Sequence, residues 1–211
     1  MKNIAIICAM QKELELVSGL SADNCNIRCR LSGIGKVNAA LTARDIIAET
    51  GPDCVLSIGV AGSFTPGIRE GDVVIAERTA YHDVWCGEGT VPGQVDGCPE
   101  FFECDNYLVE KAARALPGAR KGLIISGDQF FISRQEDIRQ RDLYPDALAV
   151  DMESAAIAQT CCRYGVPFLA IRVISDTHLD GKQPERYEGF WSELAEESFD
   201  ALRAFLHQSF L

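Results

Sequence analysis

Acidic residues follow four short apolar runs of this sequence, at the point where each run would end as a strand. These carboxylates are Glu13, Asp128, Asp151, Glu153 and Asp176. A charge is costly to bury unpaired, so each needs a partner. The N-terminus of a helix is the ordinary partner, and it would satisfy any one of them alone. Several carboxylates at one rim favour a shared site, because carboxyl groups held together can divide acid and base roles.

The apolar runs indicate the elements that must position these carboxylates. They are 4–9, 54–60, 73–76, 122–126, 147–150 and 168–175. Continuous apolar runs of this length are typical of strands covered on both faces. Helical patterns lie between several of them, at 37–50, 105–116 and 153–165, and a last amphipathic pattern includes Ala195, Phe199, Leu202 and Leu206. The alternation predicts a three-layer α/β/α domain, in which ligands bind beyond the carboxyl ends of the strands.

Other motifs at these strand ends allow two interpretations each. The segment 32–40, SGIGKVNAA, is either a weak phosphate-binding loop or a tight turn into a helix, because it lacks the full spacing of either glycine-rich phosphate motif. Val60, Ala61 and Gly62 would let a ligand approach the backbone closely. Phe130 and Phe131 belong either to the core or to a loop at the rim of the site, where an aromatic side chain can stack on a flat heterocycle.

Length and charge exclude several classes of protein. The 211 residues suit one domain over 1–211, with 47% hydrophobic and 24% charged residues. The net charge of -11 argues against binding to nucleic acid or an anionic membrane, but it does not exclude a small, nearly neutral nucleoside. The irregular stretch Trp85 to Glu103 is long enough to be either a functional loop or a surface excursion.

The nine cysteines predict neither a metal site nor a disulfide framework. They are scattered without a CxxC pair, and the three histidines have no ligand-like spacing relative to them. The apolar run 4–9 is too short for a signal sequence or a membrane span. We therefore expect a cytoplasmic protein with reduced cysteines and no metal.

Motifs along most of the chain resemble those of one enzyme family. They are, in order, AMQKE, SGIGKVNAA, IGVAGSF, GDVVIAE followed by YHD, GLIISGDQF, VDMESAAIA and RVISD. Each is weak alone, but the ordered set resembles the 5′-methylthioadenosine/S-adenosylhomocysteine nucleosidase branch of the purine nucleoside phosphorylase superfamily. The resemblance implies a central mixed, mostly parallel sheet and a homodimer without a cofactor. It also implies hydrolysis of a 5′-substituted adenosine to free adenine and the ribose derivative.

The resemblance also implies a role for each matching residue. Glu13 would be the general base that deprotonates the attacking water, and Asp176 the general acid that protonates the purine at N7. Glu153 would bind the ribose hydroxyls, with Met152 beneath the sugar. The remaining substrate-binding positions are Val60, Ala61, Gly62 and Ser175, with Phe130 stacking on adenine and the Phe131 backbone at its edge. These types suit the reaction, because breaking the bond builds positive charge on the sugar and negative charge on the base.

Three features depart from the family pattern, and they concern one edge of the sheet and the pocket for the 5′ group. The segment 16–31 is shorter than in the family, and Val60 stands where the family often has serine. The loop 84–94 has glycine, threonine, valine and proline where the family commonly has aromatic residues, with Trp85 displaced. We interpret Asp151 either as a structural residue or as one that supports the residues in contact with the substrate, and we expect an altered 5′ pocket.

Four other functions fit parts of the sequence. A phosphorylase of the same superfamily would need cations for phosphate, but Ser57 stands where such enzymes usually have arginine. A futalosine-type hydrolase would suit an opened 5′ pocket. A non-catalytic nucleoside sensor would need neither Glu13 nor Asp176, and a flavodoxin-like signalling domain would leave the VDMES and RVISD segments unexplained.

Overall fold

The computed structural model describes residues 2–18, 25–130, 139, 142–177 and 183–210. The strands are β1 Lys2–Cys8, β2 Cys25–Leu31, β3 Cys54–Ser63, β4 Val73–Tyr81, β5 Phe102–Glu103, β6 Arg120–Ser126, β7 Ala147–Asp151 and β8 Phe168–Thr177. The helices are α1 Gln11–Val17, α2 Lys36–Thr50, α3 Asn106–Ala115, α5 Ser154–Tyr164, α6 Gln183–Glu193 and α7 Ala195–Phe210. No helix among these described segments is long and apolar enough to span a bilayer.

The eight strands form one mixed sheet with the order β2-β1-β3-β7-β6-β4-β5. β8 lies off this path and pairs with both β3 and β4, parallel to the first and antiparallel to the second. Pairing therefore runs around a closed circuit from β3 through β7, β6, β4 and β8 back to β3. The continuous apolar runs fit this arrangement, since the side chains of β8 are buried along its whole length.

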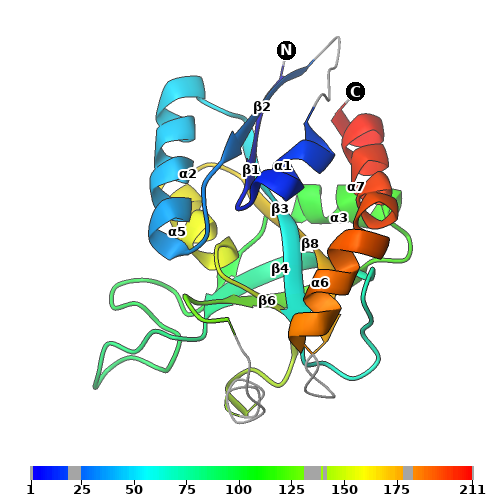
Figure 1. Ribbon diagram of the computed structural model, residues 1–211. Coiled ribbons are helices and arrows are strands. Elements are labelled where there is room, and N and C mark those ends of the chain that lie inside the picture. Colours follow the sequence, from blue (N-terminus) through cyan, green and yellow to red (C-terminus); the bar gives the residue numbers. More distant parts are fainter. Residues whose placement is uncertain (1, 19–24, 131–138, 140–141, 178–182, 211) are drawn as a thin grey trace.

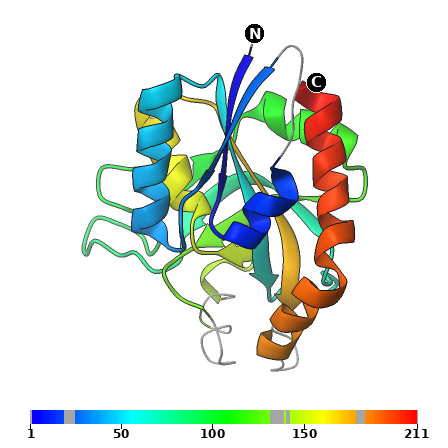
Figure 2. The same cartoon turned by 45° about the horizontal axis from the view of Figure 1, so that its top comes forward.

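Helices cover the sheet on two sides (Figures 1 and 2). α2 and α5 pack together on one side, and α1, α3, α6 and α7 lie on the other. Both helices of the first pair end at a glycine, because Gly51 and Gly165 have positive φ and donate their N–H groups to carbonyls of the last helical turn. The three-layer α/β/α class predicted from the sequence is confirmed.

Every apolar run predicted as a strand is a strand, and each predicted helical pattern is a helix. Four elements of the structure, namely β2, β5, α1 and α6, were not among those predicted from the sequence. β2 pairs in parallel with β1 at the edge of the sheet and alternates apolar side chains with asparagine and arginine. The segment 16–31 thus contains one edge strand in its described part, which ends at the loop leading into α2.

Candidate active site

A cavity opens where the ends of β1, β7 and β8 approach the second half of β3. The volume of the cavity, including the part that is open to solvent, is about 620 Å³. Its described lining residues are Ala9, Met10, Glu13, Ile34, Val60, Ala61, Gly62, Gln129, Phe130, Val150, Asp151, Met152, Glu153, Ser175, Asp176, Gln183 and Tyr187. Every catalytic or substrate-binding residue implied by the family resemblance lines this cavity except Phe131, which lies outside the described residues. Asp128, the remaining carboxylate predicted for a shared site, is not among the lining residues.

Strand pairing brings distant parts of the chain together at Gly62. On one side Gly62 pairs with Val150 of the antiparallel strand β7, and on the other with Asp176 of the parallel strand β8. The register shifts between Ala61 and Gly62, so Ser175 is an extra residue in β8. Such a bulge interrupts the alternation of side chains. As a result Ser175 and Asp176, although consecutive, both line the cavity.

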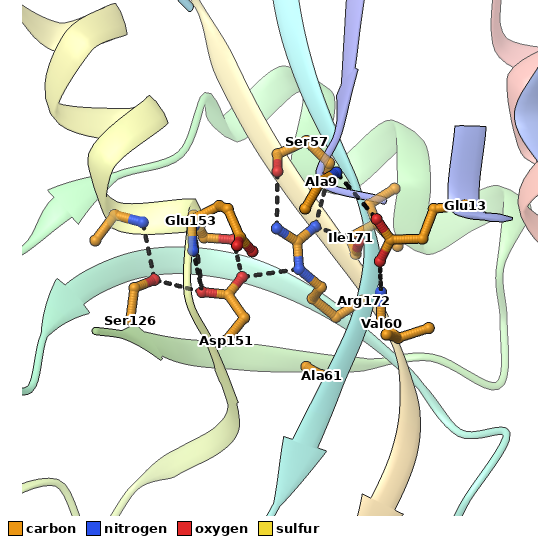
Figure 3. A network of polar contacts seen from close by, with 12 residues as sticks. Ala9, Glu13, Ser57, Val60, Ala61, Ser126, Asp151, Glu153, Ile171 and Arg172 are labelled. Atoms are coloured by element: carbon orange, nitrogen blue, oxygen red, sulfur yellow. Dashed lines mark hydrogen bonds and ion pairs between the residues drawn. The ribbon is translucent and has the colours of Figure 1, made fainter. Parts of the chain in front are cut away.

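Glu13 is buried under the cavity floor and is held by the backbone. It is the third residue of α1, and its Oε2 accepts the N–H groups of Ala9 and Met10 at 3.0 and 2.9 Å. Its Oε1 accepts the N–H of Val60 at 2.8 Å (Figure 3). Burial raises the pKa of Glu13, while the Val60 N–H and the charge of Arg172 offset part of that rise. The carboxyl is therefore fixed in place and has a raised affinity for a proton.

Gly59 leaves the space that Glu13 occupies. A Cβ atom at Gly59 would lie 2.5 Å from the Glu13 Oε1 atom. Gly59→Ala should displace the Glu13 carboxyl and lower kcat by about 10-fold to 100-fold. Steady-state kinetics would test this, with Gly118→Ala as the control because its Cβ would meet nothing within 4 Å. An unchanged kcat in Gly59→Ala would contradict this role of the glycine.

Asp151 pairs with the buried guanidinium of Arg172. The Arg172 Nε donates to Asp151 Oδ2 at 2.8 Å, and its other nitrogens donate to the backbone oxygen and the hydroxyl of Ser57 at 2.9 and 2.8 Å. Figure 3 shows Arg172 between Asp151 and Glu13. Burying such a pair is favourable only when further hydrogen bonds satisfy both groups, and Ser126 and Ser154 also donate to Asp151. Asp151 thus has a structural role as the partner of Arg172, which is one of the two alternatives left open by the sequence.

The same carboxylate shapes the turn that carries Glu153. Asp151 accepts the N–H groups of Glu153 and Ser154 at 3.3 and 3.2 Å, so it caps the first turn of α5. The Glu153 side chain is then available to reach α2, where its Oε1 accepts the N–H of Gly35 at 2.9 Å. Burial, followed by the charge of Asp151, raises the pKa of Glu153 to about 8.

This pKa predicts how stability varies with pH. With a pKa of about 8 in the folded protein and about 4.3 in the unfolded chain, Glu153 keeps a proton on folding that the unfolded chain loses. The stability that Glu153 contributes to the free energy of unfolding by holding this proton is fully present below about pH 4 and is lost as pH rises through about 8. Glu153→Gln cannot ionise, so its Tm should rise relative to wild type between about pH 5 and about pH 8. Thermal melts across this range test the prediction. A difference in Tm between Glu153→Gln and wild type that stays constant with pH would contradict the raised pKa of Glu153.

Asp176 is almost fully buried, at 1% exposure, yet it belongs to the cavity wall. The Ser175 hydroxyl lies 2.6 Å from Asp176 Oδ1 and 3.3 Å from the carbonyl oxygen of Ala61. Because the hydroxyl spans these two acceptors, it fixes the Asp176 side chain against β3. The sequence predicted Asp176 at this wall, but it gave no sign of the bulge that turns it inward.

The aromatic wall of the cavity has two parts. Phe130, after β6, is 49% exposed, and its ring lies edge-on to Tyr187 of α6 with centroids 5.9 Å apart. The Tyr187 hydroxyl donates to the sulfur of Met10 at 3.3 Å. Half of the Phe130 side chain therefore remains open to solvent and free to cover a flat ligand.

The glycine-rich loop before α2 binds protein carboxylates. At the start of this helix the N–H of Gly35 donates to Glu153 and the N–H of Lys36 donates to Asp128 at 2.7 Å. A phosphate-binding loop would offer these N–H groups to its ligand. The interpretation of SGIGKVNAA as a phosphate loop is therefore wrong, and the alternative of a tight turn into the helix is correct.

Sequence reasoning missed residues whose signals were weak. Arg172 was detectable as the only charged residue in the apolar run 168–175, which indicates a buried ion pair. Gly59 gave no signal beyond its place in a strand, and Gln183 and Tyr187 lie in the unpredicted helix α6. No group of three His, Cys, Asp or Glu side chains in the described part of the chain is arranged to hold a metal ion.

Comparisons with known proteins show the superfamily to which this chain belongs. A family model described as the phosphorylase superfamily matches residues 21–207. A nucleosidase of Anoxybacillus flavithermus for 5′-methylthioadenosine and S-adenosylhomocysteine is 34% identical, with 98% of each chain covered. Its namesake from Marinomonas is 40% identical over 79% of this chain and 74% of its own. This chain belongs to the 5′-methylthioadenosine/S-adenosylhomocysteine nucleosidase family of that superfamily.

Solved structures agree along the whole chain. The nucleosidase of Neisseria meningitidis in complex with methylthio-immucillin-A has a TM-score of 0.88 and 35% identity, covering 99% of this chain and 100% of its own. The S-adenosylhomocysteine nucleosidase of Streptococcus pyogenes in complex with 5-methylthiotubericidin has a TM-score of 0.91 and 29% identity, covering 99% and 97%. Both relatives bind small nucleoside analogues.

Proposed function

We propose that this enzyme hydrolyses the N-glycosidic bond of 5′-methylthioadenosine or S-adenosylhomocysteine, releasing free adenine and the ribose derivative. The observation that supports this most is that Glu13, Glu153 and Asp176, from three distant parts of the chain, line one cavity. Such a set can supply a base, a sugar-binding group and an acid. Together with the family membership, it favours a nucleosidase acting in methionine salvage.

In the proposed reaction Asp176 gives its proton to N7 of the purine. The C1′–N9 bond then breaks, its electron pair stays with the base, and adenine leaves neutral. The sugar becomes positively charged at C1′, and the surrounding carboxylates stabilise that charge. Glu13 takes a proton from the water that attacks C1′, and solvent exchange restores both carboxyl groups. No cofactor takes part in these steps.

The remaining substrate contacts follow the cavity walls. Glu153 would bind the ribose hydroxyls, and Met152 would pack beneath the sugar. Phe130 would stack on adenine, with the backbone of Phe131 at its edge. Val60, Ala61, Gly62 and Ser175 would form the wall around the base and the sugar, and all of these except Phe131 line the cavity.

Water is favoured over phosphate as the nucleophile. None of the described residues lining the cavity is lysine or arginine, and three of them are carboxylates besides Asp151. The Arg172 guanidinium is 2% exposed and is bound to Asp151 and Ser57. Among the described lining residues, a phosphate dianion would therefore find no free cation to bind it.

A panel of nucleosides assayed with and without phosphate tests the function. The panel contains 5′-methylthioadenosine, S-adenosylhomocysteine, adenosine and futalosine, and free base and sugar products are measured. We expect adenine release from the first two at rates independent of phosphate. Release only with phosphate, together with a sugar 1-phosphate, would identify a phosphorylase. Binding without cleavage of any member would identify a nucleoside sensor.

A homodimer is proposed from an exposed apolar row beside the cavity. Leu31, Ile34, Val37 and Leu41 are 41%, 52%, 69% and 58% exposed, and they lie at the end of β2 and the start of α2. Large apolar side chains gathered at one place are typical of interfaces. Because Ile34 also lines the cavity, a second copy here would cover its opening. Sedimentation should give a dimer, and Val37→Glu should shift it to monomers.

The same proposal extends to the cellular context. We propose one domain over 1–211 that acts in the cytoplasm on a small-molecule nucleoside. The net charge of -11 does not favour nucleic acid or an anionic membrane as a partner.

A further inference from the structure

Three segments meet beside the cavity at the start of α2, in contacts that the proposed reaction does not use. They are the first residues of α2, the residues after β4 and the turn after β6. Each segment contributes one charged residue, namely Lys36, Asp83 and Asp128. We call this group the Lys36–Asp83–Asp128 ring.

The hydrogen bonds of this ring close on themselves. The Lys36 Nζ lies 2.8 and 2.7 Å from the two carboxylate oxygens of Asp83. The Oδ2 atom of Asp83 also accepts the N–H of Asp128 at 2.9 Å, and the Oδ1 atom of Asp128 accepts the N–H of Lys36 at 2.7 Å. Each residue is therefore held by both of the others. Backbone groups take part, so the ring fixes chain positions as well as side chains.

The Lys36–Asp83 pair is better protected than an ordinary surface ion pair. The side chains of Lys36 and Asp83 are 22% and 14% exposed, whereas that of Asp128 is 46% exposed. Two glycines leave the space it needs, since a Cβ atom at Gly127 would lie 2.8 Å from Asp83 Cγ, and one at Gly35 would lie 3.0 Å from Asp128 Oδ1. Partial burial reduces the screening that makes exposed pairs weak. The ring can thus hold the three segments in one arrangement.

Two parts of the cavity wall depend on this arrangement. Phe130 follows Asp128 by two residues. The hydrogen bond that the Asp128 N–H donates to Asp83 therefore fixes the turn from which Phe130 reaches the cavity. The start of α2 also binds Glu153 through the N–H of Gly35. The first turn of α2 therefore connects the aromatic that faces the base with the carboxylate that faces the sugar.

We propose that Lys36 and Asp83 are positioning residues, which place Phe130 relative to Glu153 and so set the affinity for the base. This inference rests on the proposed function, because it assigns adenine to the Phe130 side of the cavity. Neither residue lines the cavity. Their effect is therefore transmitted through the Asp128 turn, and it should concern base binding more than the chemical step.

The variants Lys36→Met and Asp83→Asn test this role. Each should weaken the binding of free adenine, measured by calorimetry, by about 10-fold to 100-fold, because misplaced binding groups lose affinity steeply. The KM for 5′-methylthioadenosine should rise in parallel, while kcat changes by less than about 3-fold. The preference for ribonucleosides over 2′-deoxyribonucleosides should be unchanged, because Gly35 still holds Glu153.

A matched control separates positioning from general stability. Arg30→Met removes a different ion pair of the same helix. Arg30 lies on β2 and Glu49 on α2, and the Arg30 Nη2 atom is 2.7 Å from the Glu49 Oε2 atom. Arg30→Met should leave adenine affinity unchanged, and Lys36→Arg should restore most of the affinity that Lys36→Met loses. Equal adenine affinity in wild type, Lys36→Met and Asp83→Asn would overturn the inference. Failure of the wild-type enzyme to release adenine would instead overturn the proposed function.

Discussion

Asp176→Asn should abolish the release of adenine while the protein remains folded. Asparagine has the same shape and can still accept a hydrogen bond from Ser175 through its Oδ1 atom, which is the bond observed for Asp176 at 2.6 Å. It cannot give a proton to the purine, so the base would have to leave as an anion. Loss of a general acid lowers kcat by about 10²-fold to 10⁴-fold.

Steady-state kinetics and adenine calorimetry would measure this effect. Adenine binding should persist in Asp176→Asn, because the stacking wall at Phe130 is intact. Ser175→Ala serves as the comparison, since it removes the hydroxyl contact but keeps the acid, and its kcat should fall less. A kcat for Asp176→Asn within about 10-fold of wild type would contradict the assignment of Asp176 as the acid.

Glu13→Gln should also reduce kcat by about 10²-fold to 10⁴-fold, for two reasons that can be separated. The amide cannot take a proton from water. It also has one acceptor oxygen, whereas the Glu13 carboxylate uses both of its oxygens to bind backbone N–H groups. In the variant an NH₂ group must therefore face either Val60, which loses one hydrogen bond, or the pair Ala9 and Met10, which loses two.

The pH dependence of kcat separates the chemical role from the structural one. Burial raises the pKa of Glu13, and the base must be ionised to act. The wild-type rate should therefore fall on the acid side, as Glu13 gains its proton. This limb should be absent from Glu13→Gln if the residue is the base. An acid limb of the same midpoint in both proteins would assign it to another group.

Much of the site could be predicted because its residues stand at the ends of apolar runs. Glu13, Glu153 and Asp176 each follow a run that the structure shows as a buried strand. Small residues after a strand indicated close ligand approach at Ala61 and Gly62, and the order of the motifs then assigned these residues to the substrate wall. Their position in the cavity wall is as the resemblance implied.

What the sequence could not predict arises from pairing between distant strands. The rule that ligands bind beyond the carboxyl ends applies to parallel strands, yet β7 runs antiparallel to β3 and meets it only at Gly62. Nothing local in the sequence specifies this single pair, nor the extra residue in β8 at Ser175. Helix α6 was missed because Tyr187 and Gln183 face the cavity from a segment rich in polar residues.

The closed circuit of five strands has a consequence for how this enzyme can change its substrate range. β8 carries Asp176 and β7 leads directly into Glu153, the residues proposed as acid and sugar-binding group, and β3 lies between these two strands. Each of the three strands is paired to neighbours that are themselves paired around the circuit. A shift of any one strand would break its backbone hydrogen bonds to the strands on both sides, so mutations that move these strands should reduce activity. New substrates are more readily accommodated by altering Tyr187 on α6 or Ile34 before α2, which border the cavity from outside the circuit. Tyr187 and Ile34 can therefore vary without disturbing the strands that carry Asp176 and lead to Glu153.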